Sequence, residues 1–462
     1  MTDSLESLPN FLGFFHYDEP QNQKNLLFSL VLMNHHRKRS RTFDFKLGIQ
    51  RYKLSKLWTT RKIIRRKTHQ RLFKLFNQFL PKKIAHSMAL RISKPLRMVG
   101  CLASPKTNPA LKHRFLALPV LISFYRFWFE QSTPPNAALE KLIKNLKPDL
   151  VLFPSNAINP VGNDLTRLQR KHNFKTLFLI DNWDNLSSKS IFINQPDYLT
   201  VWGEQSREHA TNIHDIPPER VFLLGTPRFD HYFEAMKHPL ESPYSCPYIL
   251  YVGCQIPFDE LGSLSILDES LENLYQQGLL SEPLKIVYRP HPWRLPRNCP
   301  DLLDPKRFKH VIVDEQLKTH YYQYNHKKDK NIFQPALEYY PRLLKNAQFV
   351  IGPLTTMLLE ASLFQKRVLA LAYDDGIHYT NPKNALRHYL HFEGITELPA
   401  MTFAHTQDMT RSHFSDLILK EQPVDWLLHK QKLDYYLFQD EQPYAERLKT
   451  LVHQISEAWP AE

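Results

Sequence analysis

Cysteine is scarce in this chain of 462 residues, with only Cys101, Cys246, Cys254 and Cys299 present. No two of them have the two-residue spacing that is typical of a zinc knuckle or a thioredoxin-like site. The scarcity excludes a disulfide framework and predicts a reducing compartment with no structural metal.

Long hydrophobic runs are also missing, since no stretch reaches the ~18 uninterrupted apolar residues that a membrane span requires. The most apolar piece, Phe115 to Tyr125, contains Pro119 and lies between two arginines, so we interpret it as core or interfacial. The chain starts with an acidic stretch, Met1 to Glu6, where a secretory signal would be basic. We therefore expect a cytoplasmic protein.

The length and composition predict more than one folded domain. The chain is about three times as long as the ~150-residue prior for a single domain. It is 42% hydrophobic, 12% aromatic and 23% charged, which excludes a disordered or low-complexity polypeptide. At least two hydrophobic cores are expected.

Positive charge is concentrated in residues 36–100, which carry 20 Lys and Arg against one acid, Asp44; the remainder of the chain has a net charge of −5. Within this basic segment, apolar side chains recur at helical spacing, at Leu72, Leu75, Phe76 and Phe79. A basic amphipathic helix suits an anionic membrane surface, and the same charges could hold nucleic acid. A solvated helix that packs on its own domain is an equal alternative.

The rest of the chain alternates short apolar runs with helical stretches. The runs predicted as strands are 149–153, 176–181, 198–202, 220–224, 248–252, 285–288, 310–313, 348–351 and 368–372. Strands of this kind are buried on both faces of a parallel sheet that helices cover. We predict an α/β protein of two Rossmann-like, doubly wound domains facing each other across a cleft.

The domain boundaries follow from this pattern. A passage broken by prolines, 226–247, shows no convincing strand or long helix and is the expected hinge. Residues 1–230 would form the N-terminal domain and 231–400 the C-terminal domain. Residues 401–462 are expected to form a helical extension that packs back on the N-terminal domain.

Two motifs follow strands of the C-terminal domain, where ligands bind in open α/β sheets. In Arg289-Pro-His291-Pro, the flanking prolines fix an imidazole that can donate to a phosphate oxygen, with Arg289 as a fixed charge. The alternative is a rigid loop whose histidine only bonds a carbonyl. The second motif, Gly352-Pro-Leu-Thr355-Thr356, starts an apolar helix whose first amides can bind an anion.

Glu360 lies one turn further along this helix, within an otherwise apolar run. An acidic side chain there needs a partner, and ribose hydroxyls could supply one, as in dinucleotide sites. The alternative is a capped helix whose glutamate faces solvent or Lys366.

These motifs resemble the nucleotide-binding half of GT-B glycosyltransferases, above all capsule and surface-carbohydrate transferases and the CDP-glycerol glycerophosphotransferase group. The blocks Asp181-Asn182-Trp-Asp184-Asn, Val-Trp-Gly203 and Leu-Gly-Thr-Pro-Arg228-Phe-Asp230 resemble segments of the N-terminal half of such proteins. The resemblance covers about residues 148–381.

By this resemblance, the donor nucleotide would be held by residues of the two motifs, namely Arg289, His291, Thr355, Thr356 and Glu360. The donor would be a nucleotide-activated substrate, of a cytidine type, and no cofactor is expected. Metal-dependent GT-A transferases use two aspartates separated by one residue, and no such pair occurs in this chain. A metal site is therefore not expected.

Candidate catalytic and acceptor residues follow strands of the N-terminal half. Asp184, and after it Asp181, is the preferred base for an acceptor hydroxyl, although both also suit turn and cap chemistry. Further residues could hold the acceptor or bridge the domains, namely Asn156, Asn182, Lys189, Arg228 and Asp230.

The sequence therefore predicts an enzyme that moves a sugar or polyol-phosphate to a surface-polysaccharide or lipid-linked acceptor. The basic segment 36–100 would hold it on the inner membrane face. Two alternatives remain: a nucleotide-sugar epimerase on the same fold, and a nucleic-acid-binding protein that uses the basic segment.

Overall fold

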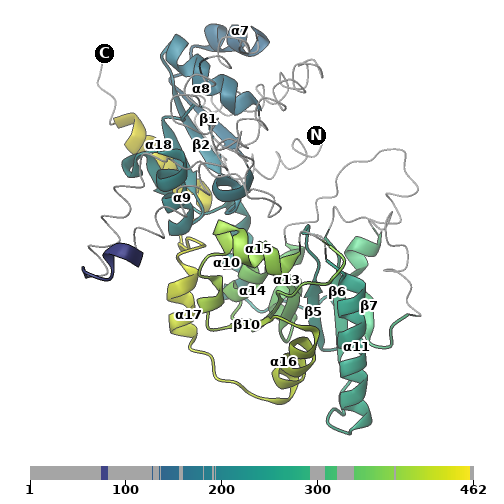
Figure 1. The fold of residues 1–462 in the computed structure, drawn as a ribbon. Helices are drawn as coiled ribbons and strands as arrows, with labels where there is room; N and C mark the ends of the chain where they lie inside the picture. Colours follow the sequence, from purple (N-terminus) through teal and green to yellow (C-terminus); the bar gives the residue numbers. More distant parts are fainter. Residues whose placement is uncertain are drawn as a thin grey trace. The chain divides into compact units, whose positions relative to one another are not determined.

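The computed structural model describes residues 74–81, 127, 135, 137–155, 160–180, 182–189, 192, 194–256, 258–291, 307–319, 338–378 and 381–457 (Figure 1). The chain forms two compact units. The first unit contains the described residues up to 226, together with Tyr435–Asp440 and residues from 444 onward. The second unit contains Pro227–Asp434 and Glu441–Pro443.

Most of the basic segment lies outside the described residues. Within residues 74–81, Leu75 and Phe79 are exposed. No helix in the described part of the chain is both long and apolar enough to cross a bilayer.

The first unit is built on a parallel sheet with the strand order β1-β2-β3-β4. Its strands are β1 (Leu150–Ser155), β2 (Lys175–Ile180), β3 (Tyr198–Val201) and β4 (Val221–Leu223). Its helices are α7 (Ala137–Leu146), α8 (Pro160–His172), α9 (Glu204–His214) and α18 (Tyr444–Glu457). The last five residues of β2 are all buried, as expected of a strand that is covered on both faces.

The second unit is built on a parallel sheet with the strand order β10-β9-β8-β5-β6-β7. Its strands are β5 (Tyr248–Val252), β6 (Lys285–Arg289), β7 (Val311–Val313), β8 (Val350–Pro353), β9 (Val368–Leu371) and β10 (Met401–Ala404). Numbered along the chain, this is the order 3-2-1-4-5-6 read from the other edge, which defines a Rossmann sheet. The predicted α/β class is confirmed, and the predicted doubly wound arrangement is seen directly in this unit.

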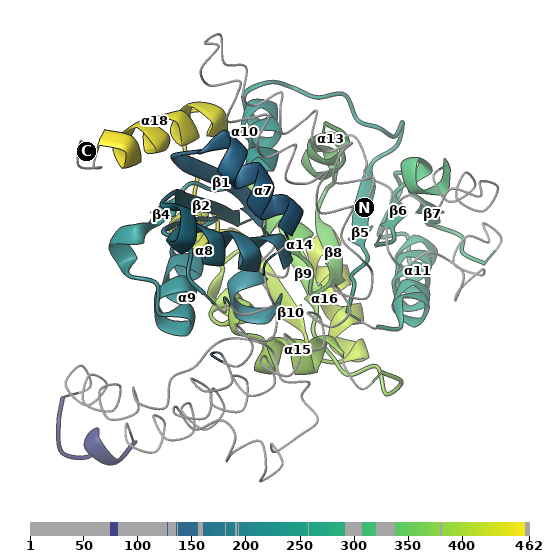
Figure 2. The same cartoon turned by 90° about the horizontal axis from the view of Figure 1, so that it is seen from above.

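The helices of the second unit are seen beside its sheet in Figure 2. They are α10 (Asp230–Lys237), α11 (Glu260–Gln276), α13 (Tyr339–Asn346), α14 (Thr356–Leu363), α15 (Pro382–His388), α16 (Gln407–Leu419) and α17 (Trp426–Leu433). Helices α11 and α16 pack together on one face of the sheet.

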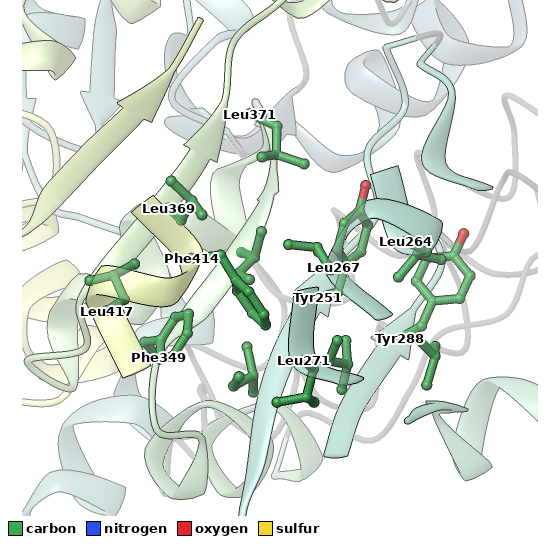
Figure 3. Packing of buried hydrophobic residues seen from close by; sticks show 14 of the residues in the cluster. Tyr251, Leu264, Leu267, Leu271, Tyr288, Phe349, Leu369, Leu371, Phe414 and Leu417 are labelled. Atoms are coloured by element: carbon green, nitrogen blue, oxygen red, sulfur yellow. The ribbon is translucent and has the colours of Figure 1, made fainter. Parts of the chain in front are cut away.

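The core of the second unit lies between its sheet and the helix pair α11 and α16 (Figure 3). Tyr251 and Tyr288 are directed from β5 and β6 towards α11, while Phe349 contacts Phe414 of α16 with ring centroids 6.1 Å apart. Fully burying one such aromatic or aliphatic side chain contributes about 1.5–3 kcal/mol. This core holds the strand ends in fixed positions.

One expectation about the chain's organisation needs correction. The strand β10 (Met401–Ala404) extends the second sheet within residues 401–462, where only helices were predicted. The passage 226–247, for which no strand or long helix was predicted, contains the short helix α10, whose eight residues include no proline.

Candidate ligand-binding site

The strand order of the second unit creates a topological switch point between β5 and β8, which pair with each other while their chain connections run to opposite sides of the sheet. Ligands of open α/β sheets bind outside the carboxyl ends of the strands at such a point. Three segments follow the strands here: Gly253 after β5, His291 after β6, and Thr355 after β8.

Two glycines let these strand ends approach each other closely. A Cβ atom on Gly352 of β8 would overlap the carbonyl oxygen of Val252 in β5. A Cβ atom on Gly253 would lie 2.9 Å from the backbone nitrogen of His291, and the Gly253 amide donates to the Arg289 carbonyl at 2.8 Å. The segments after β5 and β6 are therefore in direct contact.

The second motif of the sequence leads into helix α14 at the end of β8. Thr355 is its N-cap residue, in an extended conformation with φ −145° and ψ 156°, and its side chain makes no capping hydrogen bond. Both Thr355 and Thr356 are half-buried. The first turn of α14, with the positive end of the helix dipole, therefore lies at the carboxyl edge of the sheet.

The structure brings His291 and Thr355 to the same edge of one sheet. His291 is half-buried and lies directly after β6, and β5 separates that strand from β8. With strands ~4.8 Å apart, the two segments are roughly 10 Å from each other across the end of β5. That span suits a nucleoside diphosphate more than a single phosphate.

Arg289 is buried inside the second unit, whereas His291 and Thr355 are half-buried. Its guanidinium is buried, pairs with Asp314 at 2.7 Å, donates to Gln316 at 3.1 Å, and lies over the rings of Tyr339 and Tyr340. Burial alone would lower the pKa of Arg289, but Tyr340 and Asp314 outweigh it and raise that pKa. The positive charge of Arg289 is therefore paired with Asp314 inside the second unit.

Glu360 is buried on α14 and has two partners near the start of α10. One oxygen accepts from the Tyr232 hydroxyl at 2.5 Å, and the other pairs with Arg228 at 2.8 Å. Burial, followed by the charge of Glu360, raises the pKa of Tyr232 well above its usual value. Arg228, which was expected to contact the acceptor or the other domain, thus pairs within its own unit, and Asp230 begins α10 two residues later.

Two of the candidate acceptor and catalytic residues, Asn182 and Asp184, lie in the first unit. The side-chain oxygen of Asn182 accepts from the Trp183 amide at 3.0 Å. The carbonyl of Asp184 accepts from the amide and the hydroxyl of Ser187, at 3.2 and 3.1 Å. Both residues therefore take part in the turn that leads into the π-helix Asn185–Lys189.

Three of these predictions fall on parts that the structure does not describe. Asp181 and Asn156 lie outside the described residues, and so does the side chain of Lys189. Within the described residues, no group of three or more His, Cys, Asp or Glu side chains is arranged to hold a metal ion.

Sequence reasoning missed Glu260, which supports the segment after β5. One of its buried carboxylate oxygens accepts from the Cys254 amide at 3.1 Å, and the other accepts from the Tyr288 hydroxyl. The available signal was a glycine directly after a buried strand, followed by an acidic residue in the first turn of the next helix. Glu260 fixes the β5 segment next to His291.

Comparison with known proteins gives matches among solved structures alone, because no protein-family model and no curated protein matches the sequence. The UDP-GlcNAc 2-epimerase of Methanocaldococcus jannaschii, in complex with UDP-GlcNAc and UDP, has a TM-score of 0.42 and 13% identity over 68% of this chain and 79% of that chain. The wall teichoic acid polymerase TagF has a TM-score of 0.37 and 15% identity over 68% and 73%.

MurG of Acinetobacter baumannii has a TM-score of 0.34 and 12% identity, over 68% of this chain and 77% of that chain. The chemistry of the candidate site therefore has to follow from its own residues.

Proposed function

We propose that this chain is a transferase that takes a glycosyl or polyol-phosphate group from a nucleotide-activated donor and binds the donor at the switch point of the second unit. The observation that carries the proposal is the position of His291 and the start of α14 on either side of the β5 end. Both elements suit phosphate oxygens, and the span between them suits a diphosphate.

The roles of the donor residues follow from their surroundings. His291 would donate to one phosphate, and the amides of α14, with Thr355 and Thr356, would hold the other. Arg289 and Glu360 already have protein partners, so we assign them the positioning of the β6 segment and of α14. Hydrogen-bond donors and a helix dipole can stabilise the leaving diphosphate in a mechanism that needs no metal ion.

The first unit would bind the acceptor, and the basic segment would hold the enzyme at a membrane. Asp184, with Asp181 as second candidate, is the base that the sequence suggests for an acceptor hydroxyl, and Asn156, Asn182 and Lys189 would orient the acceptor. The basic segment 36–100 would bind the anionic inner face of a membrane, where lipid-linked and surface-carbohydrate acceptors are found.

A ligand panel tests the donor site. Thermal unfolding is measured with CMP, CDP, UDP, GDP, UDP-GlcNAc, CDP-glycerol and pyrophosphate, because a ligand that binds the native state raises the melting temperature by mass action. At least one nucleoside diphosphate should stabilise the protein more than pyrophosphate does. Stabilisation by DNA or RNA and by none of these ligands would support the nucleic-acid alternative instead.

Product analysis separates a transferase from an epimerase. The donor that stabilises the protein is incubated alone and then with carbohydrate acceptors. A transferase releases the nucleotide or forms a new glycoside, whereas conversion of the donor into an epimer with the nucleotide still attached contradicts the proposal.

A further inference from the structure

An aspartate and a histidine that the donor motifs do not include form a pair at the same edge of the second sheet. His378 Nδ1 lies 2.7 Å from Asp375 Oδ2. The Asp375 side chain is 2% exposed and that of His378 is 36% exposed, so a buried carboxylate holds a partly exposed imidazole.

The backbone fixes the orientation of Asp375. Its Oδ1 accepts from the amides of Ile377 and His378, at 3.0 and 2.9 Å, and its Oδ2 also accepts from the Asp259 amide at 2.8 Å. Burial tends to raise the pKa of Asp375, but these hydrogen bonds outweigh it and hold that pKa below its usual value. The carboxylate is therefore ionised at neutral pH.

The ionised carboxylate determines which tautomer His378 adopts. A carboxylate is only an acceptor, so Nδ1 must carry the proton that is shared with Asp375. In the neutral imidazole, Nε2 then holds the lone pair. The same logic orients the histidine of Ser-His-Asp hydrolases, where a carboxylate fixes the ring and stabilises its protonated form.

The chain path brings this pair close to the donor segments. Asp375 follows β9, while Asp259 is the N-cap of α11, which follows β5. Since β8 lies between β9 and β5 in the sheet, the segment after β9 passes the carboxyl end of β8 to reach α11. Contact between Tyr373 and Phe258, with ring centroids 5.1 Å apart, supports the same path.

We propose that His378, oriented by Asp375, is the general base of the transfer reaction in place of Asp184 and Asp181, and that it acts at the donor site of the second unit. The inference rests on the proposed function. The acceptor oxygen forms a bond to the transferred group while the bond from that group to the donor phosphate oxygen breaks. The hydroxyl proton passes to His378 Nε2, and the electron pair leaves with the nucleotide.

Chemical labelling tests the location of His378 without the need for turnover. Diethyl pyrocarbonate acylates an accessible imidazole nitrogen that carries a lone pair, and mass spectrometry identifies the labelled residue. His378 should be labelled in the free protein and protected by the nucleotide donor that stabilises the protein best. His238, which is exposed in the same unit, is the internal control and should be labelled equally with and without the donor.

Three variants test the catalytic role. His378→Ala should keep donor affinity, measured by calorimetry, but slow nucleotide release by about 100-fold or more, which is the range of general base catalysis. Added imidazole should restore part of the rate. Asp375→Asn should give a smaller loss, and His238→Ala should be unchanged.

The outcomes separate the two proposals. Donor binding without protection of His378, or an unchanged rate in His378→Ala, overturns the role of the pair and leaves the donor site in place. Failure of every nucleotide in the panel to stabilise the protein removes the proposed function, and the role of His378 with it.

Discussion

The hydroxyl of Tyr232 donates to the carboxylate of Glu360 at 2.5 Å, which joins helix α10 to helix α14. Arg228 pairs with the other oxygen of the same carboxylate at 2.8 Å. Glu360 therefore fixes the position of the helix whose first turn provides the anion site. The sequence suggested Glu360 as a ligand of ribose, whereas in the structure its carboxylate is bonded to Tyr232 and Arg228.

Substitution of Glu360 should weaken the binding of every ligand at the start of α14 to a similar extent. Glu360→Gln keeps the side-chain shape but removes the charge that pairs with Arg228. If the role of Glu360 is to position α14, calorimetry should show similar losses of affinity for pyrophosphate and for the preferred nucleoside diphosphate. A loss confined to the nucleotide would instead indicate direct contact with ribose.

Tyr232→Phe is the matched test of stability. It removes one hydroxyl and leaves the buried carboxylate with Arg228 alone. Loss of a hydrogen bond to a charged, buried group should lower the free energy of unfolding by about 1–3 kcal/mol. A melting temperature equal to that of the wild type would contradict the role assigned to this contact.

His291→Ala should weaken donor binding with little effect on folding. A hydrogen bond from an imidazole to a phosphate oxygen contributes about 1.5–3 kcal/mol, which corresponds to about a ten- to hundredfold rise in Kd. Calorimetry with the best nucleoside diphosphate measures this change. His453→Ala, at an exposed position of α18 in the first unit, is the control, and an equal loss in both variants would count against His291.

Gly253→Ala should change the geometry of the donor site, because the added methyl group has no room. The added Cβ would lie 2.8 Å from Glu260 Oε2 and 2.9 Å from the His291 nitrogen, so the segments after β5 and β6 must move apart. We expect lower thermal stability together with weaker nucleotide binding.

Gly278→Ala is the control for this substitution. Gly278 has a positive φ of 69°, and a Cβ there would have nothing within 4 Å. The backbone strain should cost about 1 kcal/mol in stability, with donor affinity unchanged. Equal binding losses in the two variants would show that a general loss of stability, and not the site, is being measured.

His429 should make the second unit less stable in acid. Its Nδ1 accepts from the Ala400 amide at 3.1 Å, and burial lowers the pKa of His429 to about 4. Between pH 6.5 and 4 the unfolded chain binds a proton that the folded protein does not, so stability falls as the pH falls through this window. His429→Asn keeps an acceptor for the amide, and its melting temperature should depend less on pH across that range.

The basic segment should attach the protein to anionic membranes. Replacing several Lys and Arg residues between 61 and 83 with Gln should release the protein from vesicles of phosphatidylglycerol, and raised salt should do the same to the wild type. Vesicles of phosphatidylcholine alone are the control. Undiminished binding of the substituted protein to anionic vesicles would remove the membrane role.

The sequence predicted the strands of both sheets because the signal for them is local. Each of the nine apolar runs became a strand, with ends shifted by two residues at most, since a strand buried on both faces needs a continuous apolar stretch. The strand β10 was missed because two of its four residues, Thr402 and Phe403, are partly exposed and the short run gives only a weak signal at the sheet edge. Helix α10 was missed because nearby prolines hid its short pattern.

The sequence alone determined the fold class and the two motifs that end at the carboxyl edge of the second sheet, because burial and turn chemistry depend on neighbours along the chain. Tertiary structure determined which side chains pair with the buried charges of these motifs. Glu360 meets Tyr232, and Arg289 meets Asp314, across distances in the chain that no local pattern reports. A buried charge must be paired, and the packing of helices and strands determines which side chain lies close enough to pair with it.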